Sequence, residues 1–236
     1  RDSAYLDSHF EGSDFRYHDF RDVDVQNYLL AAEELASRGY YVLRMGSKVN
    51  EPIIGRHHMV IDYATNGMRS DFMDIYLGGN CTFCISCGTG FDAVPILFRK
   101  PVAFVNHVPI GCLETFQKHT LAITKHHISA IDGQELSLRE ILNSGTGFAS
   151  FSSDYESKNI QLNENTPEEI RDLVIEMDER LNGTWQSHED DGSLQHKFWE
   201  IFPKDVINSD IGMPNHGRIK SRFGASFLRN NGWWLE

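Results

Sequence analysis

Short apolar segments alternate with helical segments between residues 22 and 106, and this alternation constrains the fold more than any other feature. Four segments have the apolar composition of buried strands: 40–44, 59–63, 82–86 and 102–105. Helical patterns precede or connect them, over residues 22–39, from residue 70 to about 79, and over 91–99. Short strand–helix–strand connections form parallel sheets with helices on their faces. We therefore expect an α/β protein with a Rossmann-like parallel sheet and helices on both faces.

Capping signals mark the ends of several helices. Gly39 and Gly183 suit the left-handed position that follows a helix. Residues 137–140 have the Ser–Glu spacing of a capping box and predict a helix start. Residues 166–169 predict a second one, from a threonine cap, a proline at the first helical position and two acids near the positive end of the helix dipole. The first twenty residues have no clean period, which predicts a long loop.

The length of 236 residues is enough for one large domain. We expect one Rossmann-like domain over residues 1–236, with residues 185–236 as a C-terminal extension. The chain opens with Arg1-Asp2 and no leading strand, so we interpret it as a piece that starts at the end of a missing β-strand.

The formal net charge of −12 argues against a general binder of nucleic acid or of anionic membranes. It leaves room for a phosphate ligand, because a few arginines and backbone amides can bind one on an acidic protein. No run approaches the roughly 20 apolar residues of a membrane span. Three of the four cysteines crowd one segment, which is unlike a secreted disulfide framework. We expect a cytoplasmic protein, either free or peripheral at the inner face of the membrane.

Cys81, Cys84 and Cys87 have a spacing that invites an iron–sulfur interpretation. The residues between them are strand formers, and on a strand Cys84 points away from the other two. We therefore expect small buried side chains and no metal at this segment. The adjacent pairs His57-His58 and His126-His127 are also poor metal ligands, because neighbouring residues face different ways.

The segment from Ser86 to Gly90 is the most informative motif. A buried strand runs into a glycine-containing turn and then into a helix, so Gly88 and Gly90 would let a ligand approach the backbone. The helix start offers free N–H groups to a phosphate, and Ser86 and Thr89 add hydroxyls. The motif matches neither a dinucleotide fingerprint nor a P-loop, so a turn that needs glycine only for its shape is the alternative.

Other candidates also follow predicted strands. Arg1 and Arg44 suit a diphosphate because the guanidinium fork matches two oxygens, although an internal ion pair would explain them too. Ser70 and Asp71 fit either a helix cap or ribose and base recognition. His107 follows a strand at the edge where parallel sheets bind ligands, and simple solvation is its alternative.

Several stretches resemble a bacterial family regarded as glycosyltransferases and associated with surface-polysaccharide gene clusters. The stretches that carry this resemblance are 37–46, 70–78, 87–95, 98–102, 164–170 and 227–235. More broadly, the chain resembles the C-terminal, nucleotide-sugar-binding half of GT-B glycosyltransferases. That resemblance implies a sugar transfer from a nucleotide-sugar donor to a glycan or lipid-linked acceptor, without a metal or other cofactor, and an acceptor-binding N-terminal domain that this chain lacks.

The resemblance also implies roles for particular residues. Arg1 would meet the donor diphosphate, with Asp2 beside it, and the segment from Ser86 to Gly90 would be the donor-phosphate loop. Arg1, Asp2 and His107 are the candidates for catalysis, and the general base is unassigned. Two alternatives stay open: a non-hydrolysing nucleotide-sugar epimerase, and a non-catalytic module that binds nucleotide sugars.

Overall fold

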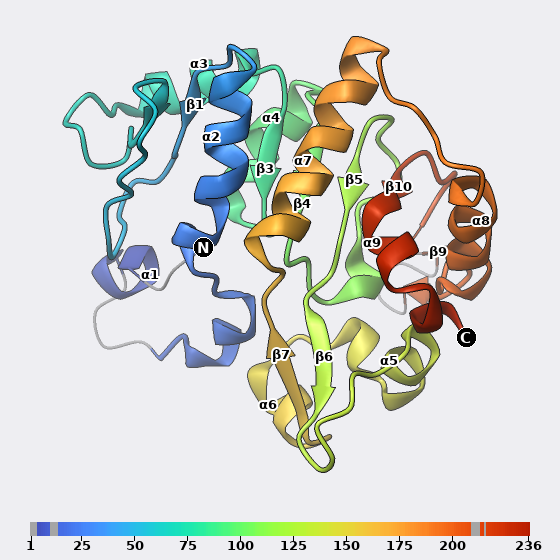
Figure 1. Ribbon diagram of the computed structural model, residues 1–236. Helices are drawn as coiled ribbons and strands as arrows, with labels where there is room; N and C mark the ends of the chain where they lie inside the picture. The colour runs from blue at the N-terminus through green and yellow to red at the C-terminus, as the bar shows by residue number, and fades with distance from the viewer. Residues whose placement is uncertain (1–3, 10–13, 209–212, 215) are drawn as a thin grey trace.

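Four parallel strands form the main sheet of the protein, in the order β10-β5-β4-β3 (Figure 1). The structure is a computed structural model that describes residues 4–9, 14–208, 213–214 and 216–236. In the order of the sheet, the strands are Arg222–Phe223, Leu121–Ala122, Val102–Phe104 and Cys84–Ser86. The protein is therefore of the α/β class with a parallel sheet, as the alternation predicts, and this sheet is compatible with a Rossmann-like fold.

The predicted strands near residues 42 and 60 form a second sheet. β1 (Val42–Leu43) pairs with β2 (Val60–Ile61), also in parallel, and neither pairs with β3. The single sheet expected from residues 40–105 is therefore wrong in detail. The main sheet is completed instead by β5 and β10, which are two residues long and too short to give a periodic signal.

Helices cover both faces of the main sheet (Figure 1). α2 (Leu29–Ser37), α7 (Pro167–Asn182) and α9 (Ala225–Asn230) lie over one face, and α4 (Ala93–Leu97) lies on the other. α3 (Asp71–Asn80) packs closely on α4, because Gly78 and Gly79 bring its backbone against Val94 and Phe98. The remaining helices are α1 (Ala4–His9), α5 (Leu138–Ser144), α6 (Ser152–Glu156) and α8 (Asp191–Ile201).

The described part of the first twenty residues is not the long loop that the composition predicts. It contains α1 and a 3-10 helix, Arg16–Arg21. Tyr5 and His9 stack one helical turn apart in α1, and Phe20 is buried against Tyr155 of α6. These contacts come from local stacking and from a distant helix, so hydrophobic periodicity does not reveal them.

The core lies between β4 and its covering helices. Val102, Ala103 and Phe104 of β4 are each at most 1% exposed. The residues expected to form a C-terminal extension contribute to this core through β10 and through a cluster of aromatic rings. Phe198, Phe223 and Trp234 stack in this cluster, and Phe227 packs edge-on against it.

Four of the predicted helix ends are confirmed. Ser137 and Thr166 each close a capping box with the glutamate three residues later. Gly39 and Gly183 adopt the left-handed φ values of 95° and 72° that follow a helix. In the described parts of the chain, no helix is long and apolar enough to cross a membrane.

Two antiparallel pairs lie outside the main sheet. β6 (His126–Ser129) pairs with β7 (Ile160–Asn163) and projects beyond the carboxyl ends of the main strands (Figure 1). The second pair is β8 (Ile207–Asn208) with β9 (Met213–Pro214).

His126 ties the β6–β7 hairpin to α7. Its Nδ1 lies 2.5 Å from Glu135 and its Nε2 lies 3.0 Å from Glu169, the capping-box glutamate of α7. Burial lowers the pKa of His126, but the two carboxylates outweigh burial and raise that pKa from 6.5 to about 10. The imidazolium is therefore the stable form over the neutral range.

Replacing His126 by glutamine should destabilise the protein in a pH-dependent way. Two partly buried carboxylates lose their cation, which should cost about 3 kcal/mol of unfolding free energy near pH 6. Because the folded pKa of His126 is raised, this loss is complete below pH 6.5 and fades as the pH approaches about 10. Urea denaturation of both proteins across this range measures it.

His196→Gln is the matched control, since His196 pairs with Glu200 at 3.2 Å on an exposed surface. It should change the unfolding free energy by less than about 0.5 kcal/mol. A His126→Gln effect that is equally small, or that does not vary with pH, would contradict the assigned ion pair.

Candidate functional site

A buried turn follows β4 and is held by two asparagines. The backbone N–H of Asn106 donates to Oδ1 of Asn165 over 2.7 Å, and the backbone N–H of Asn165 donates to Oδ1 of Asn106 over 2.6 Å. Both side chains are at most 1% exposed. This reciprocal pair holds Asn106 at a left-handed φ of 54°, and so sets the direction in which His107 leaves the strand.

His107 is buried beside the glycine loop. A Cβ built on Gly88 would lie 3.5 Å from Nδ1 of His107, and the ring packs edge-on to Phe104 at 5.2 Å. Neither ring nitrogen meets the geometry of a hydrogen bond in the described structure, although both are buried. Burial, with help from the charge of Arg21, lowers the pKa of His107 to about 4, and the nearby Cys112 backbone only partly offsets this. At neutral pH His107 is a neutral imidazole with unused hydrogen-bonding capacity.

The glycine loop is arranged around an internal carboxylate. The hydroxyl of Ser86 and the backbone N–H of Thr89 both donate to Oδ2 of Asp92 over 2.8 Å, and Thr89 and Asp92 form a capping box. The N–H of Gly88 donates to the Ser86 hydroxyl over 3.1 Å. Donors that the sequence suggests for a phosphate are thus directed at Asp92.

The helix after this loop is also shorter than predicted. Residues 91–99 were expected to be helical, whereas the chain forms a 3-10 turn, Gly90–Asp92, followed by the five-residue α4. A short helix whose N-cap is an acidic residue, here Asp92, attracts an anion weakly. Burial raises the pKa of Asp92, although the Ser86 and Thr89 donors act in the opposite direction.

Arg21 is a cation at this edge that the sequence analysis missed. It ends the 3-10 helix Arg16–Arg21, forms no ion pair with any described residue, and leaves its buried Nε without a hydrogen-bond partner. Burial raises the pKa of Cys112 and of Tyr155, and the charge of Arg21 opposes both shifts. Arg21 therefore lies within electrostatic reach of His107, Cys112 and Tyr155. The sequence around Arg21 does not predict a strand, so only the fold could show that Arg21 lies at this edge.

Two further polar groups line the same edge. The hydroxyl of Tyr155 is buried and has no hydrogen-bond partner in the described residues. Glu114 follows the turn after β4, and its Oε2 is buried and similarly unpartnered. Burial, followed by the charge of Asp92, raises the pKa of Glu114. We call Arg21, His107, Glu114 and Tyr155 the edge cluster: Arg21 lies within electrostatic reach of His107 and Tyr155, and Glu114 lies within electrostatic reach of Asp92 in the glycine loop beside His107.

The other predicted site residues have structural partners or lie outside the description. Arg44 pairs with Asp62 at 3.2 Å, with both side chains about one-tenth exposed. Ser70 is the N-cap of α3 and accepts from Met73 N–H, while the 94% exposed Asp71 side chain binds Arg69. These contacts match the ion-pair and helix-cap alternatives. Arg1 and Asp2 lie outside the described residues.

The cysteine segment is less buried than expected. Cys87 is buried, whereas Cys81 and Cys84 are half-buried. Among the described residues, no group of three or more His, Cys, Asp or Glu side chains is placed to hold a metal ion.

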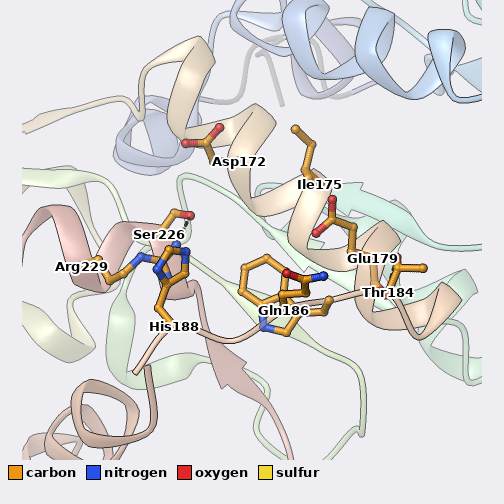
Figure 2. Close-up of a pocket in the computed structure, with 9 residues that line it drawn as sticks. Asp172, Ile175, Glu179, Thr184, Gln186, His188, Ser226 and Arg229 are labelled. Atoms are coloured by element: carbon orange, nitrogen blue, oxygen red, sulfur yellow. Dashed lines mark hydrogen bonds between the residues drawn. The ribbon is translucent and has the colours of Figure 1, made fainter. Parts of the chain in front are cut away.

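A surface depression of about 460 Å³ lies elsewhere, on the outer side of α7 (Figure 2). Asp172, Ile175 and Glu179 of α7 line one side, opposite His188 and Arg229. The cation of Arg229 is already paired with Asp191 and donates to Ser226. Because Arg229 is already paired, and because the carboxylates of Asp172 and Glu179 line the depression, it suits a phosphate less well than the edge cluster does.

Comparison of the chain with protein-family models, with curated proteins and with solved structures found no match.

The two loop glycines should respond differently to alanine. Gly88 has a φ of 81°, so Gly88→Ala should destabilise the protein by about 1–2 kcal/mol through backbone strain alone. Gly90 has no atom near its built Cβ and no positive φ, so Gly90→Ala should change stability by less than about 0.5 kcal/mol. Urea denaturation compares them, and equal effects would refute this assignment of the loop.

Proposed function

We propose that this chain is the nucleotide-sugar-binding part of a glycosyltransferase. In this proposal it transfers a sugar from a nucleotide-sugar donor to a glycan or lipid-linked acceptor in surface polysaccharide synthesis. The observation that carries the proposal is Arg21, which has no ion-pair partner among the described residues, near the buried His107, whose ring nitrogens have no hydrogen-bond partner there either, at the carboxyl edge of a parallel sheet, where α/β sheets bind ligands. The sequence resemblance supports the reaction class.

Arg21 is the residue to which we assign the donor diphosphate. Its planar guanidinium can contact two phosphate oxygens at once. Negative charge develops on the diphosphate as the sugar leaves, and a fixed cation in a partly dry site stabilises that charge. The neutral imidazole of His107 would donate one N–H to the same group. We propose a transfer that depends on these protein groups rather than on a metal.

Glu114 is the described carboxyl group best suited to accept the proton of the acceptor hydroxyl. Its raised pKa brings it closer to the operating range of a general base, and its unpartnered oxygen is free to accept a hydrogen bond. Asp92 is a weaker candidate because its carboxylate already accepts from Ser86 and Thr89. Arg1 and Asp2 remain part of the proposal on the resemblance alone, as donor-binding and catalytic candidates.

Product analysis distinguishes the proposal from its alternatives. The longest polypeptide that contains this chain would be incubated with nucleotide sugars, with and without a glycan acceptor. Release of nucleoside diphosphate together with a lengthened acceptor supports a glycosyltransferase. A change in the sugar of the donor without acceptor indicates an epimerase, and tight binding without turnover indicates a binding module. Either of the last two results rejects the proposal.

Replacing Arg21 by alanine should weaken nucleoside diphosphate binding by about 1.5–3 kcal/mol, or roughly 10- to 150-fold, because a charged hydrogen bond is lost. Isothermal titration with UDP, GDP, CDP and ADP measures the affinity. Arg16→Ala is the matched control: Arg16 starts the same 3-10 helix but is exposed and paired with Asp14 at 2.7 Å. Equal affinities for the Arg21 and Arg16 variants would remove Arg21 from the site.

A further inference from the structure

The depression on the outer side of α7 has a wall that the chain holds in place. After α7 ends, the backbone N–H of Trp185 donates to the carbonyl of Glu179 over 3.1 Å. Farther along, the N–H of His188 donates to Oδ2 of Asp191 over 3.0 Å. The segment 184–188 is therefore tied down at both ends, so its side of the depression is formed before any ligand binds.

Each carboxylate and guanidinium that lines the depression already has an opposite charge beside it. The three pairs are Asp172 with Arg171 at 2.7 Å, Glu179 with Arg38 at 3.5 Å, and Arg229 with Asp191. A charged ligand would have to compete with one of these pairs. A neutral polar ligand avoids that competition, because hydrogen bonds to the free lone pairs and N–H groups leave the ion pairs intact.

Trp185 supplies an apolar surface. The guanidinium of Arg180 lies over the indole, 4.7 Å from the ring centroid, and so fixes the orientation of the ring. Arg180 is not among the residues that line the depression, whereas Trp185 is, so the indole surface in the depression is separate from the surface that Arg180 covers. A large, fixed aromatic ring is thus available to the C–H groups of a ligand.

Uncharged polar groups complete the wall. Thr184, Gln186 and Ser226 contribute two hydroxyls and an amide (Figure 2). The exposed amide of Gln186 can both donate and accept hydrogen bonds, and the carboxylates of Asp172 and Glu179 keep acceptor sites that their ion pairs do not use. The depression therefore combines one aromatic surface with several donors and acceptors.

We infer that this depression is a binding site for a neutral carbohydrate. A pyranose has C–H groups on its faces and hydroxyls around its rim, so it can pack on Trp185 while its hydroxyls reach the polar groups of the wall. The volume of about 460 Å³ is in the range of small-ligand pockets. The depression lies on the outer side of α7 and not at the carboxyl edge of the sheet, so the inference does not depend on the proposed function.

The indole N–H resonances of the 236-residue chain test this inference. The four tryptophans give four indole peaks in a ¹H–¹⁵N spectrum, and single substitutions assign them. Maltotriose, xylotriose and triacetylchitotriose are suitable neutral probes. At least one of them should move the Trp185 peak in a saturable way, with a Kd of roughly 1–10 mM. The peaks of Trp199, Trp233 and Trp234 should stay in place, since none of these residues lines the depression.

Gln186→Ala should weaken binding of the same probe by at least about threefold, because a hydrogen bond to the ligand is lost. Gln134→Ala is the matched control, since Gln134 is also exposed but follows β6, away from the depression. Trp185→Ala should weaken binding by at least about tenfold, as measured by saturation-transfer NMR on the sugar. The Gln186 variant keeps the test valid if loss of the Arg180 contact destabilises the Trp185 variant.

The inference is overturned if none of the three sugars moves the Trp185 peak at concentrations up to about 20 mM. It is also overturned if the peak of Trp233, which is 41% exposed, moves in parallel, because that indicates adventitious stacking. Equal affinities of the Gln186 and Gln134 variants would have the same consequence. Spermidine or inorganic phosphate that moves the Trp185 peak at a lower concentration than every sugar would show that the depression selects charge, and would overturn it as well.

Discussion

The reciprocal hydrogen bonds of Asn106 and Asn165 are the constraint on which the edge of the sheet depends. Each asparagine satisfies the backbone N–H of the other in a place that water does not reach, and Asn165 also donates to the carbonyl of Thr124 over 2.8 Å. The pair thus joins the ends of β4 and β5 to the start of α7. Without these bonds, several buried backbone groups would be unsatisfied, each at a cost of about 1–3 kcal/mol. The left-handed turn at Asn106, and the position of His107 after it, are held by this network.

The charges around that turn explain how an acidic protein can present an anion site. Asp92 faces the glycine loop and is satisfied by Ser86 and Thr89, so an anion at the loop itself would meet a carboxylate. Arg21, in contrast, has no carboxylate partner in the described residues and approaches from the N-terminal 3-10 helix. Two unit charges about 4 Å apart near a protein surface interact by about 4 kcal/mol, so local pairing outweighs the net charge of −12. This balance of charges is why we propose the Arg21 side of the edge, rather than the glycine loop, for a phosphate.

The two parallel sheets are separate in the part of the chain that the structure describes. Strands β1 and β3 have interior composition but edge burial. A parallel sheet gains most of its stability from strands that are covered on both faces and paired on both sides. Because β1 and β3 each have a neighbouring strand on one side only among the described residues, they are less buried than β4 and β5.

The sequence by itself determined the features that depend on near neighbours. The capping box at Ser137, the helix start at Thr166 and the left-handed glycines after α2 and α7 were predictable, because residues within one helical turn decide them. The α/β class and four of the parallel strands followed from apolar runs and short connections. Among the site residues, His107 and the glycine loop could be proposed because each follows a strand.

Only the tertiary structure decided which strands pair and which polar groups remain free. Strands as short as β5 and β10 form because neighbouring backbones pair with them and aromatic rings pack against them. No local sequence pattern predicts such pairing. The partners of Arg44 and Asp92 could not be chosen from sequence, since any nearby carboxylate or donor would serve equally well. Arg21 and Glu114 belong to segments without a period, and they reach the edge cluster because long-range packing carries them there.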